Sequence, residues 1–152
     1  MEGVQQTIAA APPAAPRVHV NLVGFDARRR NELFDRLDGD ARFTLAHRAR
    51  RPAAAREVFA LDVAGAEQHG VELVRRLARG GGGPGVLAIV RDEDDLELAC
   101  ALVLAGAAGV ASLRQPSSCL RQAVVDIADG LASVSPALEA ELVRQLQALP
   151  AD

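Results

Sequence analysis

The chain has 152 residues and a mass of 15.9 kDa, a size at which one domain typically forms its own core. Hydrophobic residues make up 49% and charged residues 24%, which excludes a disordered or collagen-like chain. No apolar run reaches the roughly 18 residues of a membrane helix, and the N-terminus lacks the basic-then-apolar order of a signal peptide. We therefore expect a cytoplasmic protein without a membrane partner.

Charge is distributed unevenly, although the net charge is only −3. Residues 17–56 contain ten arginines and five acidic residues, a net charge of +5, whereas residues 57–152 contain seven arginines and fourteen acidic residues, a net charge of −7. This asymmetry favours either solvated surfaces or steered association with a partner. Overall acidity and an aromatic content of four Phe argue against nucleic-acid binding.

The N-terminal part begins with an Ala/Pro-rich segment, residues 1–16, that we expect to be a flexible leader. Alternating apolar residues then predict a strand over residues 18–24. Asp26 is expected to cap a helix that ends at Leu37, with Arg28–Arg30 on its outer face.

Further strands and helices alternate along the rest of the chain. The predicted strands cover residues 43–47, 58–63, 86–90 and 109–113, and the predicted helices begin near Pro52, Val71, Asp92, Pro116 and Ser135. Alternation of buried strands with helices predicts an α/β fold, a doubly wound parallel sheet with right-handed crossovers and one extra C-terminal helix. Chemistry in such sheets lies beyond the carboxyl ends of the strands.

At this level the sequence resembles the receiver domain of response regulators, specifically that of NarL/LuxR-type transcription factors. The resemblance covers residues 17–149 and implies a CheY-like five-stranded sheet of order 2-1-3-4-5. It rests on Asp62 at the phosphoacceptor position, Gly70 in the turn that follows, and the segment LAGAAGV at 104–110 before the fifth strand. The implied domains are a receiver-like domain over 17–133 and a C-terminal helix over 134–152, for dimerisation or for linkage to a DNA-binding domain.

The residues that serve phosphorylation in the family are replaced. Gly24 and Phe25 stand at the positions of the family's acidic pair, and Val90 or Arg91 at that of its Ser/Thr. Leu113 stands at the position of its Lys, and Val110 at that of its switch aromatic residue. Hard carboxylate ligands are what Mg²⁺ and an incoming phosphoryl group require. We therefore expect a degenerate receiver without Mg²⁺ or any other cofactor. The vacated pocket comprises Gly24, Phe25, Asp26, Val90, Arg91 and Leu113.

Asp62 then needs another explanation, because an unpaired buried carboxylate is unstable. Arg91, at the end of the adjacent strand, is one predicted partner; exposure of Asp62 to water at the sheet edge is the alternative. Asp26 is interpreted as a helix cap, and a phosphorylatable receiver remains only if Asp26 replaces the missing metal ligands.

No catalytic constellation is recognisable in the sequence. Cys100 and Cys119 have no metal-ligand spacing and are interpreted as buried small hydrophobes, and the glycine-rich segment 79–85 is interpreted as a connector, because no Lys exists for a phosphate-binding loop. We therefore expect no enzyme activity.

Helix surfaces are the remaining candidates for function. Predicted interface residues are Leu138, Leu142, Val143 and Leu146 on the last helix, and Leu120, Val124 and Ile127 on the helix before it, although core packing explains most of this second stripe. We expect a bacterial, phosphorylation-independent regulatory domain of transcription or signalling, acting as a homodimer or through a partner protein, without specific DNA binding by this chain alone. The alternative is a small-molecule sensor with an apolar ligand in the vacated pocket.

Overall fold

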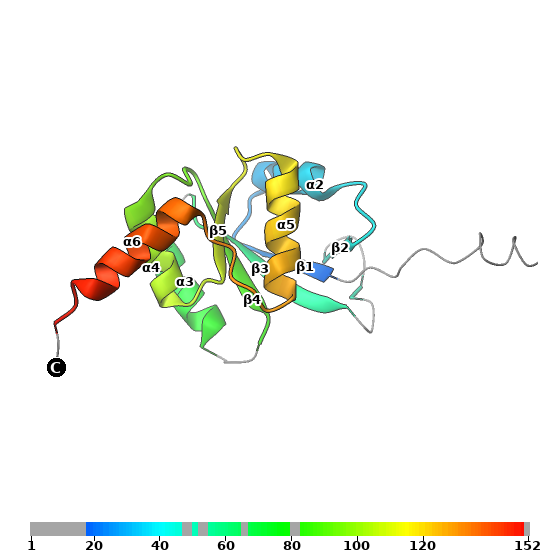
Figure 1. Cartoon of the computed structure of the whole chain (residues 1–152). Helices are drawn as coiled ribbons and strands as arrows, with labels where there is room; N and C mark the ends of the chain where they lie inside the picture. Colours follow the sequence, from blue (N-terminus) through cyan, green and yellow to red (C-terminus); the bar gives the residue numbers. More distant parts are fainter. Residues whose placement is uncertain (1–17, 47–49, 52–54, 65–66, 80–82, 151–152) are drawn as a thin grey trace, which may run out of the picture.

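The computed structural model describes residues 18–46, 50–51, 55–64, 67–79 and 83–150. Five parallel strands form one sheet in the order β2-β1-β3-β4-β5 (Figure 1). The strands are β1 (Val18–Val23), β2 (Phe43–Leu45), β3 (Arg56–Asp62), β4 (Gly85–Val90) and β5 (Gly109–Ser112). The helices are α2 (Ala27–Leu37), α3 (Glu67–Ala78), α4 (Leu96–Ala105), α5 (Ser117–Ala128) and α6 (Pro136–Gln147). The predicted doubly wound fold and its strand order are confirmed.

Some predicted boundaries differ from the observed ones. The leader, His47 and the short helix predicted at Pro52 lie outside the described residues. Helix α3 begins earlier than predicted, so Gly70 lies within a helix and not in a turn. A Cβ at Gly70 would come within 2.3 Å of a Val63 methyl group, so glycine permits the close approach of α3 to the end of β3.

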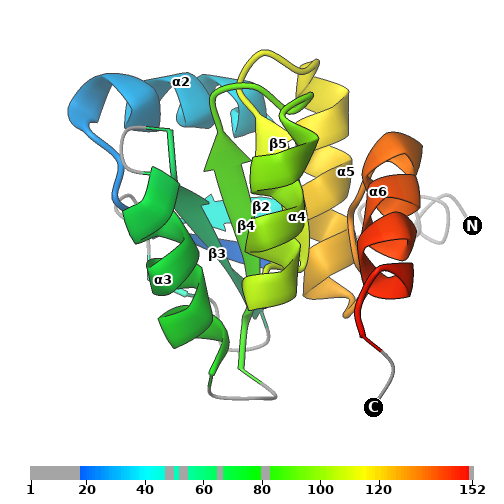
Figure 2. The same cartoon turned by 90° about the vertical axis from the view of Figure 1, so that its left-hand side faces the viewer.

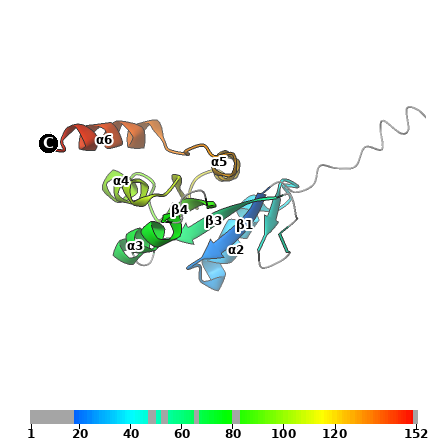
Figure 3. The ribbon, with the colours of Figure 1, turned by 90° about the horizontal axis from the view of Figure 1, so that it is seen from below.

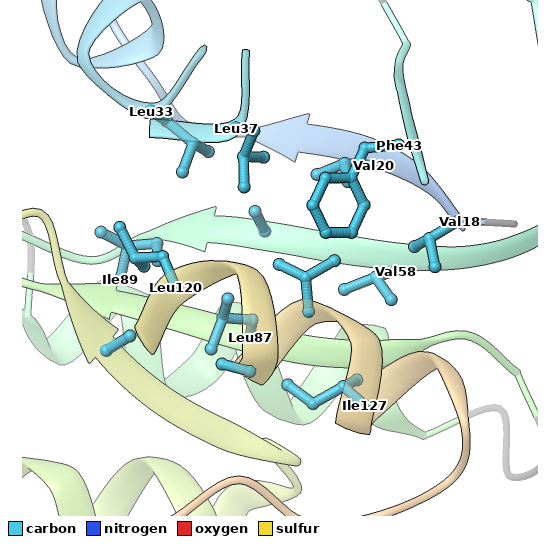
Figure 4. Packing of buried hydrophobic residues seen from close by; sticks show 14 of the residues in the cluster. Val18, Val20, Leu33, Leu37, Phe43, Val58, Leu87, Ile89, Leu120 and Ile127 are labelled. Carbon is cyan, nitrogen blue, oxygen red and sulfur yellow. The ribbon is translucent and has the colours of Figure 1, made fainter. Parts of the chain in front are cut away.

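Helices α2 and α5 cover one face of the sheet, and α3 and α4 cover the other (Figure 2). On one face, α2 and α5 pack over the sheet, and their buried apolar side chains meet those of β1, β3 and β4, as Figure 4 shows. On the other face, Val74 of α3 and Leu102 of α4 pack against Leu61 and Val86. Alternation along each strand produces this division, because successive side chains point to opposite faces. Strands β3 and β4 read as apolar runs because both of their faces are buried.

Helix α6 lies outside these two layers, along α4 (Figure 3). Ser135 caps it by accepting a hydrogen bond from the Leu138 amide at 3.1 Å, and Pro136 occupies its first turn. Leu138 is buried against Ala99 and Cys100 of α4. The predicted C-terminal helix therefore forms and is held on the domain by apolar contacts.

The predicted interface is corrected by this packing. Leu120, Val124 and Ile127 are buried in the core beneath α5, so assigning them to an interface was wrong. Leu138 is also buried, and Leu142 is partly buried in the contact with α4. On α6 only Val143 and Leu146, at 48% and 54% exposure, retain an apolar surface for another molecule, together with Leu149 beyond its end.

No helix within the described ranges is both long enough and apolar enough to cross a membrane.

Candidate functional site

The carboxyl ends of the central strands meet at one edge of the sheet. Pairing of Leu22 with Ala60 and of Asp62 with Ile89 aligns the ends of β1, β3 and β4. Asp62 is the last residue of β3, and the turn from β1 to α2 passes beside it. The predicted pocket positions are thus gathered at this edge, as expected for a parallel sheet.

Asp62 is held by Arg29, an arginine that was not among its predicted partners. The Nε of Arg29, on α2, donates to Oδ2 of Asp62 at 2.5 Å, and the Ala64 amide donates to Oδ1 at 3.2 Å. The Asp62 side chain is 5% exposed, so this charge-assisted bond lies where water screens little. The carboxylate is neutralised within the chain.

Both predicted environments of Asp62 are therefore wrong. Arg91 does not bond to it; its Nη2 donates instead to the Ala64 carbonyl at 3.1 Å, from an exposed position after β4. Exposure to water is excluded by the burial of the carboxylate. The predicted outer position of Arg29 is also corrected, because one turn of helix separates it from the buried Leu33, on the same side of α2.

Gly24 shows why no carboxylate stands at the first position after β1. Its φ is +80°, which L side chains rarely adopt, and a Cβ there would lie 3.3 Å from the Asp62 carbonyl oxygen. A side chain at this position would be strained by its backbone and crowded by β3. The backbone at position 24 therefore favours glycine over a residue whose side chain could bind a metal.

The side chains at the other predicted pocket positions have structural roles. Phe25 packs against the core on the α2 side, and Leu113 is buried in the same core. Val90 is buried on the opposite face, beneath α3 and α4. Asp26 accepts a hydrogen bond from the Arg29 amide at 2.8 Å, which confirms its predicted role as the cap of α2.

These residues do not fit the Mg²⁺ that the fold family uses. Asp62 already binds a guanidinium, Asp26 caps a helix, and Gly24 and Phe25 offer no side-chain oxygen. Over the part of the chain that the structure describes, no group of three or more His, Cys, Asp or Glu is arranged to hold a metal ion.

Arg29 was missed because its role depends on a contact between residues 33 positions apart. One signal was present: Arg29 precedes Leu33 by four positions, on the side of the helix that packs on the sheet. Long arginines at such positions place their stems on the apolar surface and their charge at its border.

Cavities lie elsewhere on the part of the molecule that the structure describes. One, of about 750 Å³, is lined by Arg51, Arg56 and Leu131 near the start of β4. Another, of about 540 Å³, is a groove between α5 and α6. Neither is lined by any residue of the predicted vacated pocket.

The two cysteines differ in exposure. Cys100 is buried as predicted, and burial raises the pKa of its thiol. Cys119 is exposed and lines the groove between α5 and α6, so its prediction as a buried residue was wrong. Helix α5 turns Leu120, and not Cys119, into the core.

No protein-family model and no curated protein matches the chain. Solved structures do match. The response regulator ChrA of a heme-sensing two-component system has a TM-score of 0.60 and 26% identity, over 90% of this chain and 69% of that one. The isolated REC domain of RcsB from Salmonella enterica serovar Typhimurium has a TM-score of 0.64 and 11% identity, over 82% and 98%. A LuxR family DNA-binding response regulator from Silicibacter pomeroyi has a TM-score of 0.57 and 21% identity, over 78% and 97%.

Fold and topology agree with these matches, since the sheet order 2-1-3-4-5 is that of the receiver fold. The chain is a structural match to the receiver domains of LuxR/NarL-family response regulators, the regulatory domains of two-component signalling.

Proposed function

We propose that the chain is a receiver-like regulatory domain of bacterial transcription or signalling that works without Mg²⁺-dependent phosphorylation and has no enzyme activity. In this proposal it acts by binding a protein partner or a second copy of itself. The observation that carries the proposal is the bond from Arg29 Nε to Asp62 Oδ2.

Phosphoryl transfer to an aspartate needs a free carboxylate oxygen and cations that neutralise the incoming phosphoryl group. Here one carboxylate oxygen accepts from a guanidinium and the other from a backbone amide. The guanidinium belongs to a helix packed on the core, so it does not exchange with solvent as Mg²⁺ would. The pair supports a domain held in a single state.

Light scattering tests this proposal directly. We expect the molar mass in solution to be unchanged by Mg²⁺ with beryllium fluoride, a phosphoryl mimic, and we expect acetyl phosphate to leave no phosphate on Asp62 by mass spectrometry. A phosphorylatable receiver treated in parallel must respond to both reagents. A mass shift on adding the mimic, or an adduct on Asp62, would overturn the proposal.

The same measurement separates a dimer from a partner-binding monomer. Val143 and Leu146 are the exposed apolar residues of α6. If α6 dimerises the chain, replacing both residues by Ser halves the mass and leaves the circular dichroism spectrum unchanged. A monomer before and after the substitutions would leave partner binding as the mode of action.

A further inference from the structure

The groove between α5 and α6 combines an apolar floor with an acidic rim. Val110 of β5, Ala123 of α5 and Leu138 of α6 contribute to the floor. Glu93, Asp94 and Asp126 contribute carboxylates, and none of its lining residues is basic. Figure 1 shows β5 lying between the two helices that form the walls.

The rim carboxylates have no cationic partner within the described residues. Glu93 accepts a short hydrogen bond from the buried hydroxyl of Ser112, and Asp126 accepts from the Gln122 amide at 2.8 Å. Neutral donors orient these carboxylates without cancelling their charge.

Neither of the two nearby arginines lines the groove or pairs with a rim carboxylate. Arg121, on α5, donates to the backbone carbonyls of Arg36 and Asp38 at the end of α2. Arg114, after β5, lies 3.9 Å from Asp92. The groove therefore retains three uncompensated negative charges beside an apolar surface.

We propose that this groove binds a segment of a partner protein in which an apolar side chain is flanked by arginine or lysine. The apolar side chain contacts the floor, and the basic side chains bond to the rim carboxylates. The inference rests on the proposed function and deepens it, because it names the surface and the chemistry of the partner.

A second copy of this chain is a poorer occupant. Six of the eight arginines that the structure describes within residues 17–56 already have partners, namely Arg28, Arg29, Arg36, Arg42, Arg51 and Arg56. Binding through them would break existing bonds. Nucleic acids and anionic lipid surfaces are repelled by the charge of the rim.

A peptide titration tests the groove. The probes are the acetylated, amidated pentapeptides Arg-Leu-Ala-Leu-Arg and Glu-Leu-Ala-Leu-Glu, added to ¹⁵N-labelled protein without Mg²⁺ or a phosphoryl mimic. We expect the basic peptide to shift amide signals around the groove and the acidic peptide to shift none. In the variant Asp94→Asn/Asp126→Asn, we expect the affinity for the basic peptide to fall at least fivefold.

A matched variant controls for net charge. Asp35→Asn/Glu97→Gln removes the same two charges from exposed positions outside the groove and is expected to keep full affinity. Equal weakening in both variants, shifts spread over the surface, or no binding of the basic peptide would overturn the inference. Groove signals that move with protein concentration alone would assign the site to a second copy and also overturn it.

Cys119 supplies a second readout inside the groove. We expect a cationic methanethiosulfonate reagent to modify this exposed thiol several times faster than an anionic one, and the ratio to fall in Asp94→Asn/Asp126→Asn but not in the control variant. Both tests are independent of Asp62. A response to beryllium fluoride would defeat the proposed function and leave the groove result standing, and failure of the peptide to bind would do the reverse.

Discussion

The carboxyl edge of the sheet and the groove between α5 and α6 both contain carboxylates, but the carboxylates differ in burial and in whether a cation neutralises them. At the edge, Asp62 is buried and paired with Arg29 at 2.5 Å. In the groove, Asp94 and Asp126 stand beside an apolar floor without a cation. At the edge where receivers carry their chemistry, the Asp62 carboxylate is therefore paired from within the chain. The carboxylates without a cationic partner lie in the groove between α5 and α6, so the groove and not the edge is the candidate surface for a partner.

Breaking the pair at the edge should have the largest effect. Arg29→Met leaves the buried carboxylate of Asp62 without its counter-charge, and we expect the free energy of unfolding to fall by about 3 kcal/mol. Arg28→Met is the control: Arg28 is 87% exposed and pairs with Glu32 at 3.4 Å, so its loss should change stability by at most about 0.5 kcal/mol.

Urea unfolding of both variants gives these values. The double variant Arg29→Met/Asp62→Asn removes both charges and is expected to recover part of the loss, which measures the coupling. Equal stability of the Arg28 and Arg29 variants would show that the pair contributes nothing and would remove the contrast between the two regions.

Removing the α6 contact should weaken one wall of the groove. Leu138→Ala deletes a side chain buried between α6 and α4, and we expect a loss of about 2–3 kcal/mol. Leu146→Ala, at a half-exposed position on the same helix, should cost about 0.5 kcal/mol or less. Hydrogen exchange should show faster exchange of α6 amides in the first variant alone; similar rates in both would mean that α6 is not held by Leu138.

Two glycine substitutions test whether β3 restricts the turn beside Asp62. Gly24 and Gly39 have nearly equal φ values, +80° and +77°, but only Gly24 lies close to another part of the chain. We expect Gly39→Ala to cost about 1 kcal/mol from backbone strain and Gly24→Ala measurably more, because its Cβ also meets the Asp62 carbonyl oxygen. Thermal unfolding compares them. Equal losses would show that β3 does not restrict this turn.

The smallest expected effect is a pH dependence of stability that arises at His19 of β1, away from both regions. Burial lowers the pKa of His19 below its usual value of 6.5, and the ring bonds to the Thr44 hydroxyl at 2.8 Å. The unfolded state therefore binds a proton first as pH falls. Stability is full above pH 6.5 and declines as pH falls from there through the lower pKa of the folded state. In His19→Gln this part of the decline should be absent from urea titrations; an identical slope would exclude His19 as its source.

Local pattern was sufficient for much of the fold. Asp26, Ser135 and Pro136 mark helix starts by chemistry that acts within one turn, and the structure places all three in those roles. Apolar runs such as 86–90 identify strands buried on both faces for the same reason. The receiver topology follows from the order of such elements, since crossovers are right-handed.

The site was harder to predict, because its contacts join distant positions. Gly24, Phe25 and Leu113 were predicted from their residue types alone to lack the side chains that bind Mg²⁺ and phosphoryl groups. For Asp62 the prediction offered Arg91, because their strand ends are adjacent, or exposure to water, whereas helix α2 above the sheet supplied Arg29. An amphipathic stripe in the sequence does not distinguish a face covered by the core from one covered by a partner. For this reason the interface prediction included Leu120, Val124 and Ile127, which the core buries.

By itself, then, the sequence determined the elements, their order, the parallel sheet and the residue types that stand at the strand ends, all of which depend on interactions between near neighbours or on residue identity. Only the tertiary structure decided which arginine neutralises Asp62, which helix stripe stays exposed, and where carboxylates remain without a cation. Such choices depend on distances between segments far apart in the chain, and a buried charge is satisfied by whichever long side chain the packing brings to it.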